Sequence, residues 1–424
     1  MSEKRRVIEA GKSLLIVLLS ILTVYLAGRA ILYDRKADQG LFMGLEALDL
    51  DTAGSLGSAG VSRPVRMAVV NADGRYAVQY DDAGVDELFD ALGDLLGQAV
   101  DSAGAAAPVE REEWEAALQE RGVYYGFPGS VPLQLISVWL GEGKTALTAQ
   151  ASSLLLASSG REGKICLYYH DGDQAYYACD TGTYFGQRLD GYIPNGAIYA
   201  FQQPERYESL APDTLLLSDA PEPPVYTVAA GVNAQDDAAL EKLLDSLSFA
   251  PQPNAIYPAA DGWNVRDADD SLRLTRTGDI YYHGGEGSDR YPVPSSATRT
   301  ELVEITGQLV HQVMTPYSGA GRIYLAAIEE DQGTWSLTYR YTLSGADVQL
   351  GAEGWCARFQ IRDGQIREYV LKLRRYTAGQ TRAVLLPEYQ AMYAMQALEA
   401  EGRQLLLRYY DNGSGTTAPS WIAR

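Results

Sequence analysis

Residues Ser13–Tyr33 read SLLIVLLSILTVYLAGRAILY, and no later stretch of the chain is as long and as apolar. No charge occurs between Ser13 and Gly28. About twenty helical residues, each rising 1.5 Å, cross a hydrocarbon layer of about 30 Å. Arg29 lies near the end, where a long side chain reaches the head groups. The sequence therefore predicts one transmembrane helix over residues 12–33 that carries everything after it.

A cleaved signal peptide is the alternative for this segment, but Gly28-Arg29-Ala30 is a poor cleavage site and the apolar stretch is long for a leader. Basic residues are slightly more numerous before the segment than after it: Lys4, Arg5, Arg6 and Lys12, against Arg29, Arg35 and Lys36. This weak bias and the very short preceding tail favour a cytoplasmic N-terminus with the bulk of the chain outside. The expected location is the cell membrane, with a single pass.

Size and charge limit what the remainder does. The chain has 424 residues and a formal net charge of −20. This charge argues against nucleic acid as a partner, because phosphate contacts need a basic surface. It also argues against a polybasic membrane-surface role beyond the anchor. Roughly 390 residues after the anchor exceed one ordinary core, so two or three domains are expected.

The order of helix-like and strand-like patterns predicts an α+β fold, in which a multi-domain extracellular region of antiparallel sheets with packed helices follows the membrane helix. The expected divisions are a cytoplasmic tail (1–11), the transmembrane helix (12–33), a stalk or linker (34–63), an N-terminal α+β domain (64–220), a middle α+β domain (221–290) and a C-terminal α+β domain (291–424).

Amphipathic patterns predict helices near residues 84–99, 110–120, 235–248 and 296–313. Pro387, as a first helical residue, predicts a further helix over 387–400. The segment 132–140 is read as an apolar strand or the start of a helix. Asp73-Gly74 and Asp363-Gly364 predict hairpin turns. Ser295 or Ser296 is the expected N-cap of the fourth helix.

Two of the three cysteines flank a predicted hairpin. Cys166 and Cys179 lie on either side of Asp171-Gly172-Asp173. If Gly172-Asp173 forms the loop, the cysteines face each other about 4.5 Å apart, within disulfide range. If Asp171-Gly172 forms it, they miss. A Cys166–Cys179 disulfide and two ordinary sheet cysteines both remain open.

A search for catalytic motifs finds little. His170, His283 and His311 form no HxxxH or HExxH pair, so a histidine-built zinc site is not expected. Gly143-Lys144-Thr145 is not a phosphate-binding loop, since Val138 stands where the first glycine is needed. No metal, cofactor or catalytic residue is predicted.

Acidic and tyrosine-rich segments are the remaining candidates outside the membrane. Asp267-Ala268-Asp269-Asp270 lacks the spacing of a calcium loop, and aspartate favours turns, so a turn is expected. The tyrosine-rich strands are candidates for a sugar- or peptide-binding face, although tyrosine is also a common strand residue.

Small residues recur on the predicted membrane helix. Ser13, Ser20 and Ala27 repeat every seven residues, Thr23 and Ala27 form a small-xxx-small pair, and Ala30 follows. Small residues let two membrane helices approach closely. Patterns of this kind also arise by chance. The segment is thus a candidate for pairing with another membrane helix.

Three later segments carry a resemblance to a known family. They are Gly122-Val123-Tyr124-Tyr125-Gly126-Phe127 with Val131-Pro132-Leu133, then Tyr339-Arg340-Tyr341 through Gly345-Ala346-Asp347-Val348, and finally Phe359 to Ile366. Their order behind a basic tail and one apolar helix resembles the YycH/YycI family, accessory proteins of the WalK–WalR two-component system of Gram-positive bacteria. The long first domain is more similar to the YycH type.

The resemblance implies a regulator that lies beside a sensor histidine kinase of the WalK type, with a YycI-like paralogue as a further candidate partner. Carried over by position, the contact residues in the membrane are Ser13, Ser20, Thr23, Ala27 and Ala30. Two other hypotheses remain: a membrane-tethered glycan- or peptide-binding ectodomain without a kinase partner, and a cell-surface hydrolase that uses acidic residues.

Overall fold

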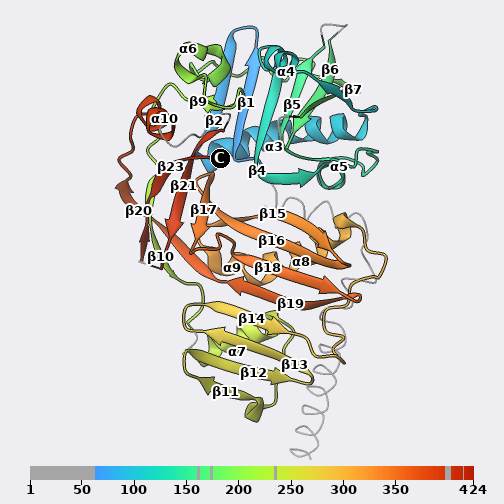
Figure 1. Ribbon diagram of the computed structural model, residues 1–424, viewed down its shortest axis with the longest axis vertical. Helices are drawn as coiled ribbons and strands as arrows, with labels where there is room; N and C mark the ends of the chain where they lie inside the picture. The colour runs from blue at the N-terminus through green and yellow to red at the C-terminus, as the bar shows by residue number, and fades with distance from the viewer. Residues whose placement is uncertain (1–62, 160–162, 172–174, 234–235, 397–402, 414) are drawn as a thin grey trace, which may run out of the picture. The chain divides into compact units, whose positions relative to one another are not determined.

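The computed structural model describes residues 63–424 except 160–162, 172–174, 234–235, 397–402 and 414 (Figure 1). These residues belong to one compact unit, Ala53–Arg424. Within them, no helix is both long enough and apolar enough to cross a bilayer. The predicted anchor at 12–33, its five small residues and nearly all of the predicted stalk lie outside the described residues.

The first part of the chain forms a seven-stranded antiparallel sheet, with strand order β2-β1-β4-β5-β6-β7-β3. Its strands are β1 (Arg66–Asn71), β2 (Gly74–Gln79), β3 (Ala107–Val109), β4 (Gly122–Pro132), β5 (Gln150–Ser158), β6 (Lys164–His170) and β7 (Tyr176–Tyr184). The hairpin predicted around Asp73-Gly74 is present, and Asn71 pairs with Gly74 across it.

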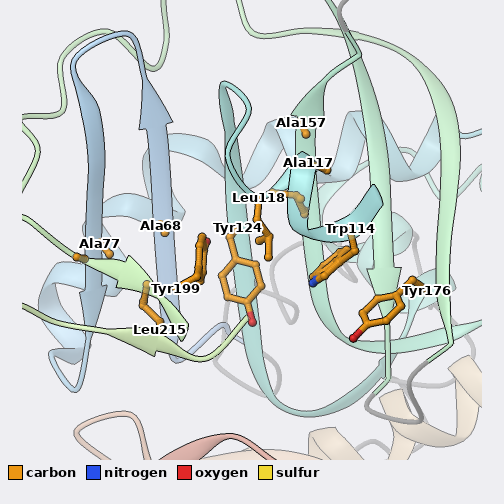
Figure 2. Close-up of a cluster of buried hydrophobic side chains, with 12 residues drawn as sticks. Ala68, Ala77, Trp114, Ala117, Leu118, Tyr124, Ala157, Tyr176, Tyr199 and Leu215 are labelled. Atoms are coloured by element: carbon orange, nitrogen blue, oxygen red, sulfur yellow. The ribbon is translucent and has the colours of Figure 1, made fainter. Parts of the chain in front are cut away.

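Successive residues of β4 separate the two faces of this sheet, because side chains alternate along a strand. The Tyr125 hydroxyl donates to the Leu92 carbonyl of α3 (Asp82–Asp101), 2.8 Å away. Tyr124 points the other way, into a cluster that includes Trp114 of α4 (Arg111–Ala117) and Tyr176 (Figure 2). The segment 132–140, read from the sequence as a strand or the start of a helix, is mostly helical and forms α5 (Leu133–Leu140). Helix α5 packs against α3.

Short elements follow the first sheet. They are β8 (Ile198–Tyr199), η2 (Ala200–Gln202), α6 (Pro204–Tyr207) and β9 (Leu215–Leu216). Strand β10 (Pro224–Ala230) then joins a three-stranded sheet with β20 (Arg374–Arg382) and β22 (Thr416–Thr417). Strand β10, which begins just after the expected division at residue 220, thus pairs with strands of the C-terminal part.

The second large sheet has eleven strands in the order β11-β12-β13-β14-β19-β18-β16-β17-β21-β23, with β15 paired to β16. Its strands are β11 (Ile256–Ala259), β12 (Gly262–Asp267), β13 (Asp270–Thr275), β14 (Asp279–His283), β15 (Arg322–Asp331), β16 (Thr334–Leu343), β17 (Ala346–Leu350), β18 (Ala357–Arg362), β19 (Gln365–Lys372), β21 (Leu405–Asp411) and β23 (Pro419–Ala423). Strands β17 and β21 pair in parallel, and the other pairs are antiparallel. Since β14 pairs with β19, one sheet crosses the expected division at residue 290.

The remaining helices are η3 (Pro253–Ala255), α7 (Asp237–Ser246), α8 (Arg299–Val313), α9 (Thr315–Ser318) and α10 (Glu388–Gln396). The N-cap of α8 is Thr298, not Ser295 or Ser296. The Thr298 hydroxyl accepts from the Glu301 N–H, and the Glu301 carboxylate accepts from the Thr298 N–H, which forms a capping box. Asp363 and Gly364 have φ values of 55° and 70°, as the predicted two-residue hairpin turn requires.

The cysteine strands pair in neither of the two registers considered from the sequence. Cys166 pairs with Asp180 and Cys179 with Leu167, one residue away from the pairing that would bring the two cysteines face to face. Consecutive strand residues point to opposite faces, so the thiols lie on opposite sides of the sheet. Both thiols are buried and free, and that of Cys166 donates to the Cys179 carbonyl, 3.1 Å away. The structure therefore contains no Cys166–Cys179 disulfide.

Candidate functional site

A row of directly paired residues crosses five neighbouring strands of the first sheet, β2, β1, β4, β5 and β6. It begins at Gln79 on the edge strand β2. Gln79 is opposite Arg66, Arg66 opposite Gly126, Gly126 opposite Ser153, and Ser153 opposite His170. Directly paired residues share one face of a sheet. The four polar side chains of this row are buried, each at most 6% exposed. Such a polar row on an otherwise apolar face needs hydrogen-bond partners.

Gly126 provides the space for Arg66. A Cβ atom at Gly126 would lie 2.4 Å from Nε and 2.5 Å from Cγ of Arg66. These separations are too short for any side chain, so only glycine lets the arginine stem cross β4. The charge of Arg66 is thereby held within the sheet face instead of in solvent.

Asp213, from the loop before β9, closes over the row. One carboxylate oxygen, Oδ2, accepts from Tyr124 at 2.9 Å, Ser153 at 3.1 Å and the Gln404 amide at 3.0 Å, and His170 Nε2 lies 3.2 Å from it. Asp213 is 1% exposed. Donors from three distant parts of the chain therefore meet at one buried oxygen.

Electrostatic interactions within this cluster keep both Asp213 and Arg66 ionised. Burial alone would raise the pKa of Asp213, but His170, Arg66 and the Tyr124 hydroxyl lower it well below its ordinary value. Burial also opposes the charge of Arg66, yet Tyr124 and Asp213 raise the pKa of its guanidinium above the ordinary value. The cluster thus contains a carboxylate and a guanidinium that are both ionised.

A cavity of about 300 Å³ adjoins the cluster. This volume is at the lower end of the range for small-molecule sites, about 300–1,000 Å³. The first sheet, the Asp213 loop and strands β17, β21 and β23 all contribute to its lining. The lining residues that matter below are Arg66, Gln79, Phe127, Asp213, Leu406, Ile422 and Arg424.

Three buried polar atoms of this lining have no hydrogen-bond partner among the described residues. They are Nε of Arg66, Oε1 of Gln79 and Oδ1 of Asp213. A buried donor or acceptor without a partner costs roughly 1–3 kcal/mol, so native proteins usually satisfy such atoms. Their concentration around one cavity indicates a place that an added molecule completes.

The arrangement does not suit hydrolysis. In a nucleophilic triad the serine hydroxyl meets the histidine, and the histidine's other nitrogen meets the acid. Here the Ser153 hydroxyl donates to Asp213 instead, on the same oxygen that His170 approaches. The pKa of Asp213 is lowered, whereas a general acid near neutral pH needs a raised one.

The acidic segment singled out from the sequence forms the expected turn. Asp267 pairs with Asp270 at the end of the β12–β13 hairpin, and Ala268 has a φ of 52°. Arg290 binds both carboxylates, with Nη2 2.9 Å from Asp267 and Nε 2.6 Å from Asp270. Among the residues that the structure describes, no group of acidic, histidine or cysteine side chains is arranged to hold a metal ion.

The histidines and tyrosines divide between buried and exposed positions. His170 belongs to the buried cluster, and His283 lies at the surface, 3.2 Å from Glu368. The largest fully buried side chains are mainly tyrosines, among them Tyr124, Tyr339 and Tyr369. Most of the tyrosine-rich pattern thus serves the core. The sequence did not single out Arg66 or Asp213, since each reads as an isolated charge in a strand or a proline-rich loop.

Comparison with known proteins identifies the fold. No protein family matches the sequence, and no curated protein is significantly similar to it. Among solved structures, YycH from Bacillus subtilis matches with a TM-score of 0.53 and 11% sequence identity, over 86% of this chain and 94% of that one. The chain therefore has a YycH-like fold, as the sequence resemblance predicted.

Proposed function

We propose that this chain is a membrane-anchored, extracytoplasmic regulator of a sensor histidine kinase of the WalK type. The observation that carries the proposal is the fold shared with YycH over most of both chains. At 11% identity this likeness concerns the fold alone, and the step to function rests on the YycH/YycI resemblance of the sequence.

The proposed contact with the kinase lies in the membrane. The helix at 12–33 anchors the chain, and its small residues Ser13, Ser20, Thr23, Ala27 and Ala30 face the partner helix. A YycI-like paralogue is a further proposed neighbour on the same side of the membrane. The regulator forms and breaks no covalent bonds, in keeping with the arrangement of Ser153, His170 and Asp213.

The test is reconstitution of the full chain with a WalK-type kinase in lipid nanodiscs, with autophosphorylation and co-purification as readouts. We expect the chain to change the autophosphorylation rate several-fold. Replacing Ser20, Thr23 and Ala27 together by leucine or isoleucine should remove most of that effect, because bulky side chains prevent close helix approach.

The matched control replaces Leu18, Leu22 and Leu26 by isoleucine, which conserves side-chain volume on the same helix. This control should pair with the kinase like the unaltered chain. An unchanged rate with the unaltered chain present would overturn the proposal, and unchanged co-purification of the small-residue variant would remove the membrane contact.

A second candidate function is a membrane-tethered peptide- or glycan-binding ectodomain without a kinase partner. The cavity with its unpaired polar atoms favours this alternative. Ligand binding that persists while the kinase assay shows no effect would select it.

A further inference from the structure

The three unpaired atoms of the cavity define what an occupant has to offer. Nε of Arg66 is a donor, whereas Oε1 of Gln79 and Oδ1 of Asp213 are acceptors. Both charged residues are at least nine-tenths buried, at 5% and 1% exposure. A molecule that satisfies all three atoms therefore carries an acceptor next to a hydrogen-bond donor.

The charges of the lining favour an anionic acceptor. Among the described residues, neither Arg66 nor Arg424 lies within 4.0 Å of a carboxylate oxygen, so Asp213 acts on Arg66 only at longer range. The Arg66 guanidinium donates directly to the neutral Gln404 amide. Arg424 donates to the Pro128 carbonyl, 2.7 Å away. A guanidinium binds a carboxylate strongly, through two parallel N–H···O hydrogen bonds.

Asp347 and Arg111 of the lining already have direct partners. Asp347 lies 2.8 Å from Arg340 and 3.0 Å from Arg408, and Arg111 lies 2.6 Å from Glu115. Arg66 and Arg424 are therefore the cations of the lining that remain for a ligand carboxylate.

The two acceptors and the apolar wall describe the rest of the occupant. An N–H group beside the carboxylate would donate to Asp213 Oδ1 or Gln79 Oε1. Phe127, Leu406 and Ile422 give the cavity an apolar side. A volume of about 300 Å³ admits a molecule of one or two amino-acid residues.

We infer that this cavity binds a small acylamino acid, a carboxylate adjacent to an amide N–H, as found at the C-terminal residue of a short peptide. The carboxylate binds Arg66 and Arg424, and the N–H binds the free oxygen of Asp213. The site itself needs no kinase; its role as the input of the regulator rests on the function proposed above.

Binding to the purified full chain in nanodiscs tests the inference, with saturation-transfer NMR and calorimetry as readouts. The probes are N-acetylalanine, dialanine and N-acetylalaninamide. We expect saturable binding of the first two and at least tenfold weaker binding of the third, which lacks the carboxylate. Preference for dialanine over N-acetylalanine identifies a peptide source, and the reverse identifies a free acylated amino acid.

Three variants probe the residues involved. Arg66→Met and Arg424→Met should each weaken carboxylate binding at least tenfold. Gly126→Ala should weaken it as well, because its methyl group displaces the Arg66 side chain. Arg358→Met is the matched control, since Arg358 lies exposed on β18 in the other large sheet, and it should bind like the unaltered chain.

The melting temperature of each variant shows whether it folds, and Arg424→Met carries the test if the buried Arg66 cannot be replaced. If no probe binds saturably at concentrations up to about 10 mM, the cavity holds only water and the inference is overturned. Equal binding of the amide, or unchanged binding by Arg424→Met, would overturn it too. These readouts are separate from kinase activity, so failure here leaves the kinase test standing.

Discussion

The interactions that hold Asp213 in the fold require its carboxylate to be ionised. Its Oδ2 atom accepts hydrogen bonds from the hydroxyls of Tyr124 and Ser153 and from the Gln404 amide, and it lies 3.2 Å from His170 Nε2. The positive charge of Arg66 lowers the pKa of Asp213 further. Because the native state holds the carboxylate more tightly than an unfolded chain does, protonation of Asp213 opposes folding.

We expect Asp213→Asn to lower the free energy of unfolding at pH 7 by about 2–4 kcal/mol, because Arg66 loses its buried counter-charge. The folded pKa of Asp213 is depressed, so its contribution is complete above the unfolded value of about 3.9 and is lost as the pH falls below it. Urea unfolding from pH 7 down to pH 3 measures both effects.

Asp219→Asn is the control, because Asp219 lies exposed shortly after β9, six positions further along the chain. It should change stability by less than about 0.5 kcal/mol. An Asp213→Asn variant as stable as this control at pH 7 would contradict the role given to the carboxylate.

Among the elements, helix α3 shows a close approach that depends on glycine. A Cβ atom at Gly97 would lie 2.1 Å from the Leu140 carbonyl oxygen at the end of α5. At Gly93, one turn earlier in the same helix, the nearest atoms belong to the Phe89 ring at 3.2 Å. The Leu140 backbone cannot move aside as the Phe89 ring can. A side chain at position 97 is therefore excluded by α5, whereas one at position 93 is tolerated.

We expect Gly97→Ala to destabilise the chain by about 1–3 kcal/mol, although alanine is the better helix former by about 1 kcal/mol. Gly93→Ala is the matched control and should stay within about 1 kcal/mol of the unaltered chain. Thermal and urea unfolding of the two variants measure the difference. Equal stability of both would show that α3 and α5 separate without cost.

Element by element, local signals in the sequence predicted much of the secondary structure. The turns at Asp73-Gly74 and Asp363-Gly364 were predicted because each contains the residue that a tight hairpin needs. Strand β20 was missed, since all but two of its nine residues are exposed and it shows no alternation. The sequence left open whether Cys166 and Cys179 form a disulfide or are two ordinary sheet cysteines, and the structure has free thiols in a register one residue away from the face-to-face pairing, with a bulge between Lys164 and Cys166.

The candidate site could not be predicted in the same way. Arg66, Ser153 and His170 meet only because β1, β4, β5 and β6 lie side by side in one register. The nearest local signal was Gly126 within an apolar strand, because such a glycine often marks a close approach of another group. Asp213 lies in a stretch that composition marks only as a loop.

In the described unit, an ion pair also joins the first sheet region to the second. The two terminal guanidinium nitrogens of Arg322 on β15, Nη1 and Nη2, donate to the carboxylate of Asp86 on α3, at 2.9 and 2.7 Å. The two residues are 236 positions apart in the sequence. Nearby, Gly129 of β4 lies so close to β15 that a Cβ atom there would be 2.8 Å from the Leu325 carbonyl. Residues 63–424 therefore form a candidate cooperative unit.

A double-mutant cycle with Asp86→Asn and Arg322→Met tests this contact. We expect a coupling energy of about 1 kcal/mol, because the pair is bidentate but about one-third exposed. Asp86 also binds Arg63, and the cycle removes that contribution from the coupling. Calorimetry should show one main transition, and two transitions together with zero coupling would mean that the two regions unfold independently.

The span between Arg66 and Gln404 has a consequence for biosynthesis. These side chains bind each other across 338 positions of sequence, and Gln404 also completes the shell of Asp213. If the first sheet folds before Gln404 is synthesised, Arg66 and Asp213 lack this partner and stay exposed until it arrives. Such a charged, uncovered sheet face is a feature by which chaperones and proteases can distinguish incompletely folded chains from folded ones.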